Sequence, residues 1–189
     1  MSVSYVEPAQ ADKRTKDFYT AAEERFEMLL NIFKVFGHAP ELGEAFTRSV
    51  MAMLKDGELD WLTKELIILK ATHRNACQYC VVQHETLSKR LGISEEKIAD
   101  IGDDRYKDSP HFTDAEKTLM DFTVQIGVDA NHLSAELWDR LHTHFTEPQI
   151  VEAAYVITQY IAISKFGDAL GVELEPVFAE FTPILPVSH

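Results

Sequence analysis

The stretch PQIVEAAYVITQYIAISKFGDAL, residues 148–170, decides the fold. Thr146 and Gln149 are spaced as a capping box ahead of it, and Pro148 suits the first turn of a helix. A helix that is apolar on more than one face lies either at the centre of a core or against another subunit. This segment therefore predicts a long helix in one of those two places. Its apolar residues are Ile150, Val151, Ala154, Tyr155, Val156, Ile157, Tyr160, Ile161 and Ile163.

The rest of the chain predicts further helices and no strand. Apolar residues recur at spacings of three and four, which is the period of one helical face. Thr113 with Glu116 forms a second capping box, and Asn75, Ser94 and Ser134 are suitable N-caps. Residues 103–111 read as a surface loop. The expected fold is an all-α domain of about eight helices that spans residues 1–189. The helices before residue 148 are expected at about 17–36, 41–55, 60–73, 75–91, 94–102, 113–126 and 134–145.

Composition limits the classes of protein that this chain can belong to. A chain of 189 residues with 46% apolar and 26% charged residues can bury a core without disulfide staples. The net charge of −13 disfavours nucleic acid and anionic lipid surfaces as partners. The N-terminal residues lack the apolar run of a signal peptide, and no stretch is long and apolar enough for a membrane span. We therefore expect a cytoplasmic protein.

The two cysteines of the chain lie close together in HRNACQYCVVQHE, residues 73–85. In a reducing cytoplasm such a pair is more often catalytic or metal-binding than structural. Cys77, Cys80 and His84 are spaced to project from one face of a predicted helix. A neutral imidazole one turn from Cys80 can take the thiol proton, whereas the helix N-terminus favours a negative sulfur at Cys77. Because the directed base is the larger effect, we assign the attack to Cys80 and the resolving role to Cys77.

Glu65 is an acid in an apolar setting on the preceding predicted helix. Its helical neighbours are Trp61, Ile68 and Leu69, so we expect it to be partly buried. Burial would raise the pKa of its carboxyl group and suit it to carry a proton. The other interpretation is that Glu65 forms an ion pair or reaches solvent at the edge of the helix.

Two other interpretations of the cysteine cluster stay open. His73, Cys77, Cys80 and His84 are zinc ligands by type, although one helix face rarely closes a tetrahedron. Alternatively, the cysteines are small buried core residues and the histidine lies at the surface.

The combination of Glu65, CQYC at residues 77–80 and His84 resembles the redox motif of a known family. With the preceding TKELIIL, it is similar to the alkylhydroperoxidase D-like (AhpD-like) branch of the carboxymuconolactone decarboxylase superfamily. The stretches NIFKVFGHAPEL, residues 31–42, and EPQIVEAAYVITQYIAISKFGDALGVELEP, residues 147–176, also resemble that superfamily. The decarboxylase branch lacks the cysteine pair, which argues against lactone decarboxylation.

The resemblance implies an AhpD-like helical fold that assembles as homo-oligomers, commonly trimers or hexamers. It makes Cys80 the thiol that attacks peroxide, Cys77 its disulfide partner, and Glu65 and His84 members of a proton relay. Some relatives have a histidine where this chain has Tyr79, so the relay is shorter here or the Tyr79 hydroxyl substitutes in part.

The expected function is thiol-dependent reduction of hydroperoxides through a Cys77/Cys80 disulfide cycle, with no cofactor and no metal. The apolar helices weakly favour organic peroxides as substrates. By the resemblance, the reductant is a lipoylated protein or a thioredoxin-like donor. The alternatives are a protein disulfide reductase or dithiol relay, and a redox-sensing or zinc-binding module without peroxidase turnover.

Overall fold

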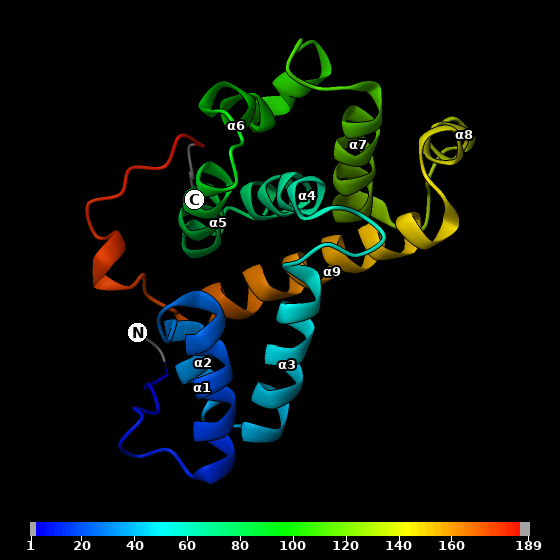
Figure 1. Cartoon of the computed structure of the whole chain (residues 1–189). Helices are drawn as coiled ribbons and strands as arrows, with labels where there is room; N and C mark the ends of the chain where they lie inside the picture. Colours follow the sequence, from blue (N-terminus) through cyan, green and yellow to red (C-terminus); the bar gives the residue numbers. More distant parts are fainter. Residues whose placement is uncertain (1–2, 186–189) are drawn as a thin grey trace.

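The computed structural model describes residues 3–185, and for residue 103 its backbone alone. Within this part of the chain the regular structure is entirely helical, which confirms the predicted all-α class (Figure 1). Nine α-helices are described where about eight were expected. They are α1 (Lys13–Phe26), α2 (Asn31–Phe36), α3 (Pro40–Met53), α4 (Trp61–Arg74), α5 (Gln78–Arg90), α6 (Glu95–Ile101), α7 (Asp114–Asp129), α8 (Ala135–His144) and α9 (Glu147–Leu170), with 3-10 helices η1 (Gly102–Lys107) and η2 (Pro176–Phe178).

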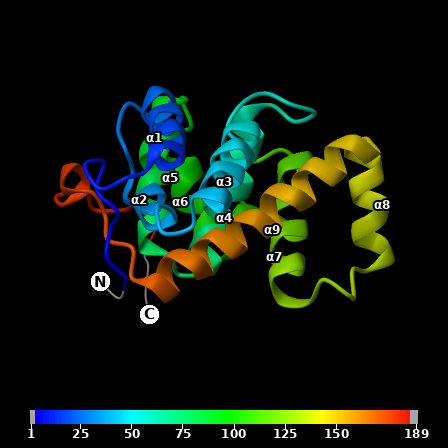
Figure 2. The same cartoon turned by 90° about the horizontal axis from the view of Figure 1, so that it is seen from below.

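Helices α4 and α9 form the centre of the molecule. Helix α9 crosses its whole width, with α1 to α3 on one side and α4 to α7 on the other (Figures 1 and 2). Helix α4 packs against α5, α7 and α9, and every residue from Lys64 to Thr72 is buried. Of the two places predicted for the helix at residues 148–170, the structure supports the core, because Ala153, Val156 and Ile157 are fully buried.

Several helices begin at the capping residues that the sequence predicted. Thr113 and Glu116 form the expected capping box of α7, and Thr146 and Gln149 form that of α9. The Ser94 hydroxyl caps α6 by accepting the backbone N–H of Lys97, three residues along the chain. The Ser134 hydroxyl caps α8 by accepting the backbone N–H three residues after it. These caps satisfy backbone N–H groups that a helix start otherwise leaves without a partner.

The predicted helix over residues 17–36 is wrong as a single element. Helix α1 ends at Phe26, where Glu27 takes a left-handed conformation, and α2 begins only at Asn31. The apolar spacing continues across the break because both helices face the same core, where the Phe26 and Phe33 rings stack with centroids 5.6 Å apart. The spacing of the apolar residues therefore indicated the shared core correctly but did not reveal where the helix is interrupted.

Two further predictions need correction. Asn75 does not cap the helix that carries the cysteines; it ends α4, and Cys77 is the N-cap of α5. Ala76 takes a left-handed conformation that allows this tight connection. Residues 103–111 are not entirely a surface loop, because η1 covers their first part and the Tyr106 side chain is fully buried.

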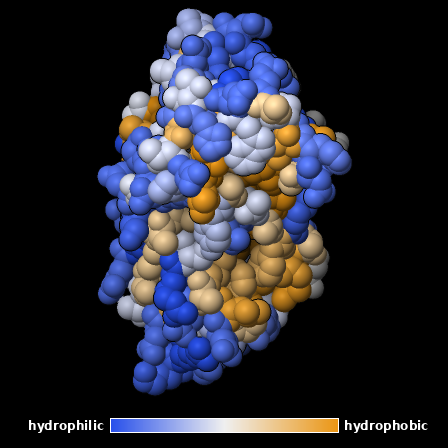
Figure 3. All heavy atoms as spheres, turned by 90° about the vertical axis from the view of Figure 1, so that its right-hand side faces the viewer, coloured by the Kyte–Doolittle hydropathy of each residue, from blue (hydrophilic) through white to orange (hydrophobic). Residues whose placement is uncertain are grey.

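Some large apolar side chains stay exposed. Figure 3 views the molecule from the side on which α8 lies. Apolar side chains gather over the lower half of this face of the molecule. Trp138 on α8 and Val151 and Tyr155 on α9 are among the exposed large apolar residues. The homo-oligomer implied by the family resemblance stays a prediction. No helix in residues 3–185 combines the length and the apolar character needed to cross a bilayer.

A buried ion pair joins the two central helices. The ammonium group of Lys64 on α4 is fully buried and lies 2.9 Å from a carboxylate oxygen of Glu152 on α9. The other oxygen of Glu152 accepts the backbone N–H of Leu59 at 2.6 Å. This pair fixes α4 against α9, and the candidate active site lies between these helices and α5.

We expect Glu152→Ala to destabilise the protein, because Lys64 would keep a buried charge without its partner. The free energy of unfolding should fall by about 3 kcal/mol, as for other buried pairs that lose one member. Urea unfolding followed by circular dichroism at neutral pH measures this change. Glu23→Ala on the exposed face of α1 is the control, and a loss equal to that of the control would contradict the prediction.

Candidate active site

The two cysteine sulfurs are in contact at the start of α5. The Cys77 Sγ and Cys80 Sγ atoms lie 2.7 Å apart, and both cysteines are free. Cys77 precedes the helix, and its sulfur accepts the backbone N–H of Cys80 at 3.4 Å. A disulfide joins sulfurs about 2.05 Å apart, so closing one here requires only a small movement.

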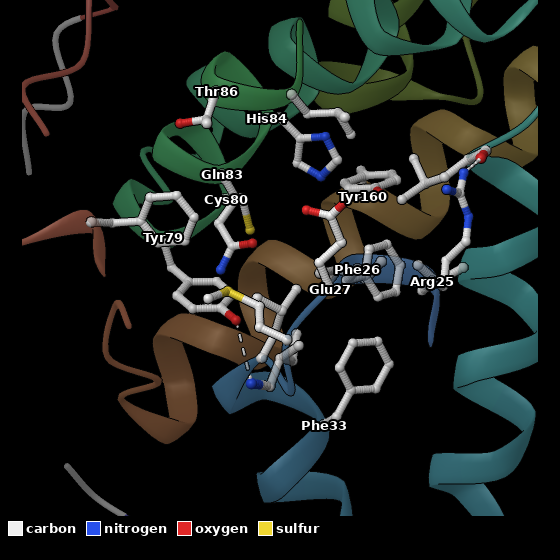
Figure 4. A pocket seen from close by; sticks show the side chains of 18 of the residues that line it. Arg25, Phe26, Glu27, Phe33, Tyr79, Cys80, Gln83, His84, Thr86 and Tyr160 are labelled. Atoms are coloured by element: carbon white, nitrogen blue, oxygen red, sulfur yellow. Dashed lines mark hydrogen bonds between the residues drawn. The ribbon is translucent and has the colours of Figure 1, made fainter. Parts of the chain in front are cut away.

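A cavity of about 390 Å³ opens beside Cys80 (Figure 4). Cys80 forms part of its wall, whereas Cys77 is fully buried and lies outside the lining. A small molecule in the cavity therefore meets the Cys80 sulfur and not the Cys77 sulfur. The volume lies within the range of small-molecule sites. The lining is mainly apolar and includes Phe26, Phe33, Phe46, Trp61 and Phe178.

His84 and Glu65 form a hydrogen-bonded pair at the cavity wall. His84 Nδ1 lies 2.8 Å from Oε2 of Glu65, a fully buried carboxyl group. The indole Nε1–H of Trp61 donates to Oε1 of Glu65 at 3.0 Å. With its Nδ1 atom turned to the Glu65 carboxyl group, His84 has Nε2 as the ring nitrogen left for another partner. Of this pair, only His84 lines the cavity. Glu65 is fully buried where partial burial was expected, so the interpretation that it reaches solvent is wrong, whereas its contact with His84 agrees with the expected ion pair.

The surroundings of Cys80 keep its proton on the sulfur. Its contact with Cys77, together with burial, raises the pKa of the Cys80 thiol well above its usual value. Ser164 on α9 opposes this effect, because its hydroxyl donates to the Cys80 sulfur at 3.8 Å and lowers the pKa. Attack by Cys80 therefore requires a proton acceptor, and His84 stands one turn away on the same helix.

Tyr79 is held by partners outside the proposed relay. Its hydroxyl donates to Glu175 Oε1 at 3.1 Å and accepts the backbone N–H of Ile32 at 3.3 Å. Glu175 also accepts from Gln83 and from the backbone N–H of Asn31. The negative carboxylate and burial raise the pKa of Tyr79 well above its usual value, with burial the larger cause. The Tyr79 hydroxyl is therefore occupied by these partners, and the proton relay of Glu65 and His84 stays a prediction.

The four residues considered as zinc ligands do not gather into one site. Cys77 and Cys80 lie together, but His84 turns one ring nitrogen to Glu65, and the His73 ring lies beside Gly102. Within residues 3–185 no group of three or more histidine, cysteine or acidic side chains is arranged to hold a metal ion.

Sequence reasoning missed the contribution of α9 to this site. Ser164 contacts Cys80, and the Tyr160 ring stands edge-on to His84 with centroids 4.8 Å apart. The signal that could have found them is the four-residue spacing that places Tyr160 and Ser164 on one face of a helix that is apolar on more than one face. Glu175, which comes from a distant segment, gave no such signal.

Residues 40–123 match the model of the Carboxymuconolactone decarboxylase family. This match confirms the family resemblance. Helices α3 to α5, and with them both cysteines, Glu65 and His84, lie inside the matched segment. The Bacillus subtilis protein YdfG, which is uncharacterized, is 22% identical over 134 residues, covering 70% of this chain and 89% of YdfG.

Solved structures with a similar fold cover nearly the whole chain. The AhpD core of a peroxidase-related protein from Ralstonia eutropha aligns with a TM-score of 0.82 at 18% identity, over 99% of this chain and 97% of that one. The debrominase Bmp8, as a variant in complex with 2,3,4-tribromopyrrole, aligns with a TM-score of 0.80 at 18% identity, over 93% of this chain and 92% of that one. The fold of this protein is therefore AhpD-like.

Replacing Cys77 by serine should make Cys80 easier to ionise, because the neighbouring sulfur raises the pKa of Cys80. The midpoint of the pH–rate profile for alkylation by iodoacetamide should move to lower pH, with a gain of about tenfold at neutral pH per unit of pKa. Ser164→Ala should shift the profile to higher pH, because it removes the hydrogen bond that lowers the pKa. An unchanged or raised midpoint for Cys77→Ser would contradict this account.

Proposed function

We propose that this protein reduces organic hydroperoxides through a redox cycle of Cys80 and Cys77. The observation that carries the proposal is the arrangement of the two sulfurs: one stands in the wall of an apolar cavity, and the other lies 2.7 Å behind it. The family match and the AhpD-like fold support a peroxidase-related role in general. The cysteine cycle and the substrate class are our proposal.

The apolar lining favours peroxides with an organic body. Aromatic and aliphatic side chains gain from contact with a hydrocarbon group, whereas hydrogen peroxide would leave most of the cavity to water. Cys80, His84 and Tyr160 all line the cavity wall. A hydroperoxide can therefore place its O–O group at the sulfur and its apolar body among the phenylalanines.

In the first step, His84 Nε2 accepts the proton of the Cys80 thiol. The thiolate attacks the distal oxygen of the hydroperoxide, so an S–O bond forms as the O–O bond breaks. The alkoxide that leaves takes its proton from His84 and departs as an alcohol. The carboxylate of Glu65 stabilises the positive charge that His84 carries between these two transfers. Cys80 is thereby oxidised to a sulfenic acid.

In the second step, Cys77 condenses with the oxidised Cys80. The Cys77 sulfur loses its proton and attacks the Cys80 sulfur, so an S–S bond forms and the hydroxyl group leaves as water. The balance of both steps is two thiols and one hydroperoxide in, and one disulfide, one alcohol and one water out. An external dithiol, such as a lipoylated or thioredoxin-like protein, must then reopen the disulfide by exchange.

Other activities in the same fold class have to be separated from this one. One structural neighbour is a debrominase, and the same two sulfurs also suit a disulfide reductase or a redox sensor. A reductase would cycle without peroxide, and a sensor would form the disulfide without turnover. Stoichiometric zinc bound through the cysteines would rule out the proposal.

Mass analysis with one equivalent of cumene hydroperoxide tests the cysteine cycle. We expect the unsubstituted protein to lose two hydrogens as the disulfide forms, and Cys77→Ser to gain one oxygen at Cys80. Cys80→Ser should stay unmodified. Turnover should follow when dihydrolipoamide or reduced thioredoxin is added. Peroxide consumption by Cys80→Ser together with its loss in Cys77→Ser would reverse the two roles.

Replacement of Glu65 by glutamine tests the proton relay. The amide can donate to His84 Nδ1 and so place the ring proton on Nε2, where the lone pair is needed. Cumene hydroperoxide reduction should slow on the order of 100-fold, the usual scale for loss of a general base. Glu85→Gln is the control, because Glu85 is also fully buried but binds the backbone N–H groups of Ile184 and Leu185. An unchanged rate across pH would remove Glu65 from the relay.

A further inference from the structure

The hydroxyl group of Tyr160 has no hydrogen-bond partner among the described residues. Tyr160 lies on α9, is 3% exposed and lines the cavity. Within the described part of the chain, Ser88 Oγ is the one fully enclosed side-chain nitrogen or oxygen atom that lacks a partner. The unpaired Tyr160 oxygen is therefore not fully enclosed. Because Tyr160 lines the cavity, a molecule bound there can accept its hydrogen bond.

The ring that carries this hydroxyl packs against His84. The Tyr160 ring is T-shaped to His84, with centroids 4.8 Å apart and an interplanar angle of 87°. Figure 4 shows the two rings side by side, and both residues line the cavity together with Cys80. Burial, and after it the charges of Glu65 and Cys80, raise the pKa of Tyr160 well above its usual value. The hydroxyl therefore keeps its proton at neutral pH and acts as a donor.

We propose that Tyr160 is a catalytic residue whose hydroxyl donates a hydrogen bond to the proximal oxygen of the bound hydroperoxide. The inference rests on the proposed function and names the group that stabilises its leaving oxygen. When the Cys80 sulfur takes the distal oxygen, the electron pair of the O–O bond moves to the proximal oxygen. A donor aimed at the place where negative charge develops stabilises the transition state more than the ground state.

Tyr160 does not change the proton balance of the attack on the hydroperoxide. His84 receives the Cys80 proton and delivers it to the departing alkoxide, while Tyr160 keeps its own proton and supplies only the hydrogen bond. The other tyrosine of the lining does not fit this role. Tyr79 already donates to Glu175 and accepts from Ile32, so its hydroxyl is occupied.

The test compares oxidants whose leaving groups differ in basicity. The rate of Cys80 oxidation in Tyr160→Phe is measured with tert-butyl hydroperoxide, which leaves as a strongly basic alkoxide, and with peracetic acid, which leaves as weakly basic acetate. We expect a loss on the order of 100-fold with the first and a loss of less than about threefold with the second, because acetate needs little stabilisation. Alkylation by iodoacetamide, which releases iodide, should stay within about twofold.

The chain offers a matched control on the same helix. Tyr155 is 48% exposed, and its hydroxyl is paired with Ser49, so Tyr155→Phe should leave all three rates unchanged. Tyr160→Phe should fold normally, because the lost hydroxyl had no partner in the protein and the ring keeps its packing.

The outcomes separate the inference from the proposed function. An unchanged rate of Tyr160→Phe with tert-butyl hydroperoxide would overturn the role of Tyr160 and leave the peroxidase proposal standing. Equal losses with all three reagents would show a structural role and also overturn it. If neither peroxide oxidises Cys80 in the unsubstituted protein, the proposed function fails, and the role of Tyr160 fails with it.

Discussion

The arrangement of the active site depends on one buried carboxyl group, that of Glu65. Removing such a group from water costs several kcal/mol unless hydrogen bonds replace the lost solvent. Trp61, one turn back on α4, supplies one bond, and His84 on α5 supplies the other. The contact with His84 therefore does two things: it compensates a buried polar group, and it fixes the ring that exchanges protons with Cys80 in the proposed mechanism. Because α4 is buried along its middle and held to α9 by Lys64, the carboxyl group has little freedom to move away.

The parts of this structure that are local in sequence could be predicted, and those that depend on helix crossing could not. The capping boxes at Thr113 and Thr146 act within one turn, so residue spacing alone reveals them. The apolar neighbours of Glu65 predicted that it is buried. Its partner His84 is 19 positions away on another helix. Their contact requires the angle at which α4 and α5 pack, which no local pattern encodes, and only the family resemblance brought the two residues together beforehand.

At the break between α1 and α2, the apolar spacing correctly indicated which side chains enter the core, but it wrongly predicted one continuous helix. The apolar spacing runs on from Phe26 to Phe33 because both rings enter one core. Helix α1 ends where Glu27 takes a left-handed conformation, and a group from far along the chain meets the start of α2: Glu175 accepts the backbone N–H of Asn31 at 2.6 Å. The break has a functional consequence, because Glu27, Met28 and Leu30 leave the helix and line the cavity. A continuous helix would give that wall a different shape.

Helix α9 contributes both to the core and to the candidate active site. It was interpreted from its apolar residues alone, and most of its buried side chains do serve the core. Tyr160 and Ser164, four positions apart, lie on one face of the helix, where the Tyr160 ring contacts His84 and the Ser164 hydroxyl contacts Cys80. Ser164 is paired with the Cys80 sulfur, whereas Tyr160 is paired with no protein group among the described residues. A core helix gains nothing from a buried hydroxyl that stays unpaired, since phenylalanine would pack as well without the polar atom. The proposed hydrogen bond to a bound hydroperoxide gives this polar atom a partner that the protein itself does not supply.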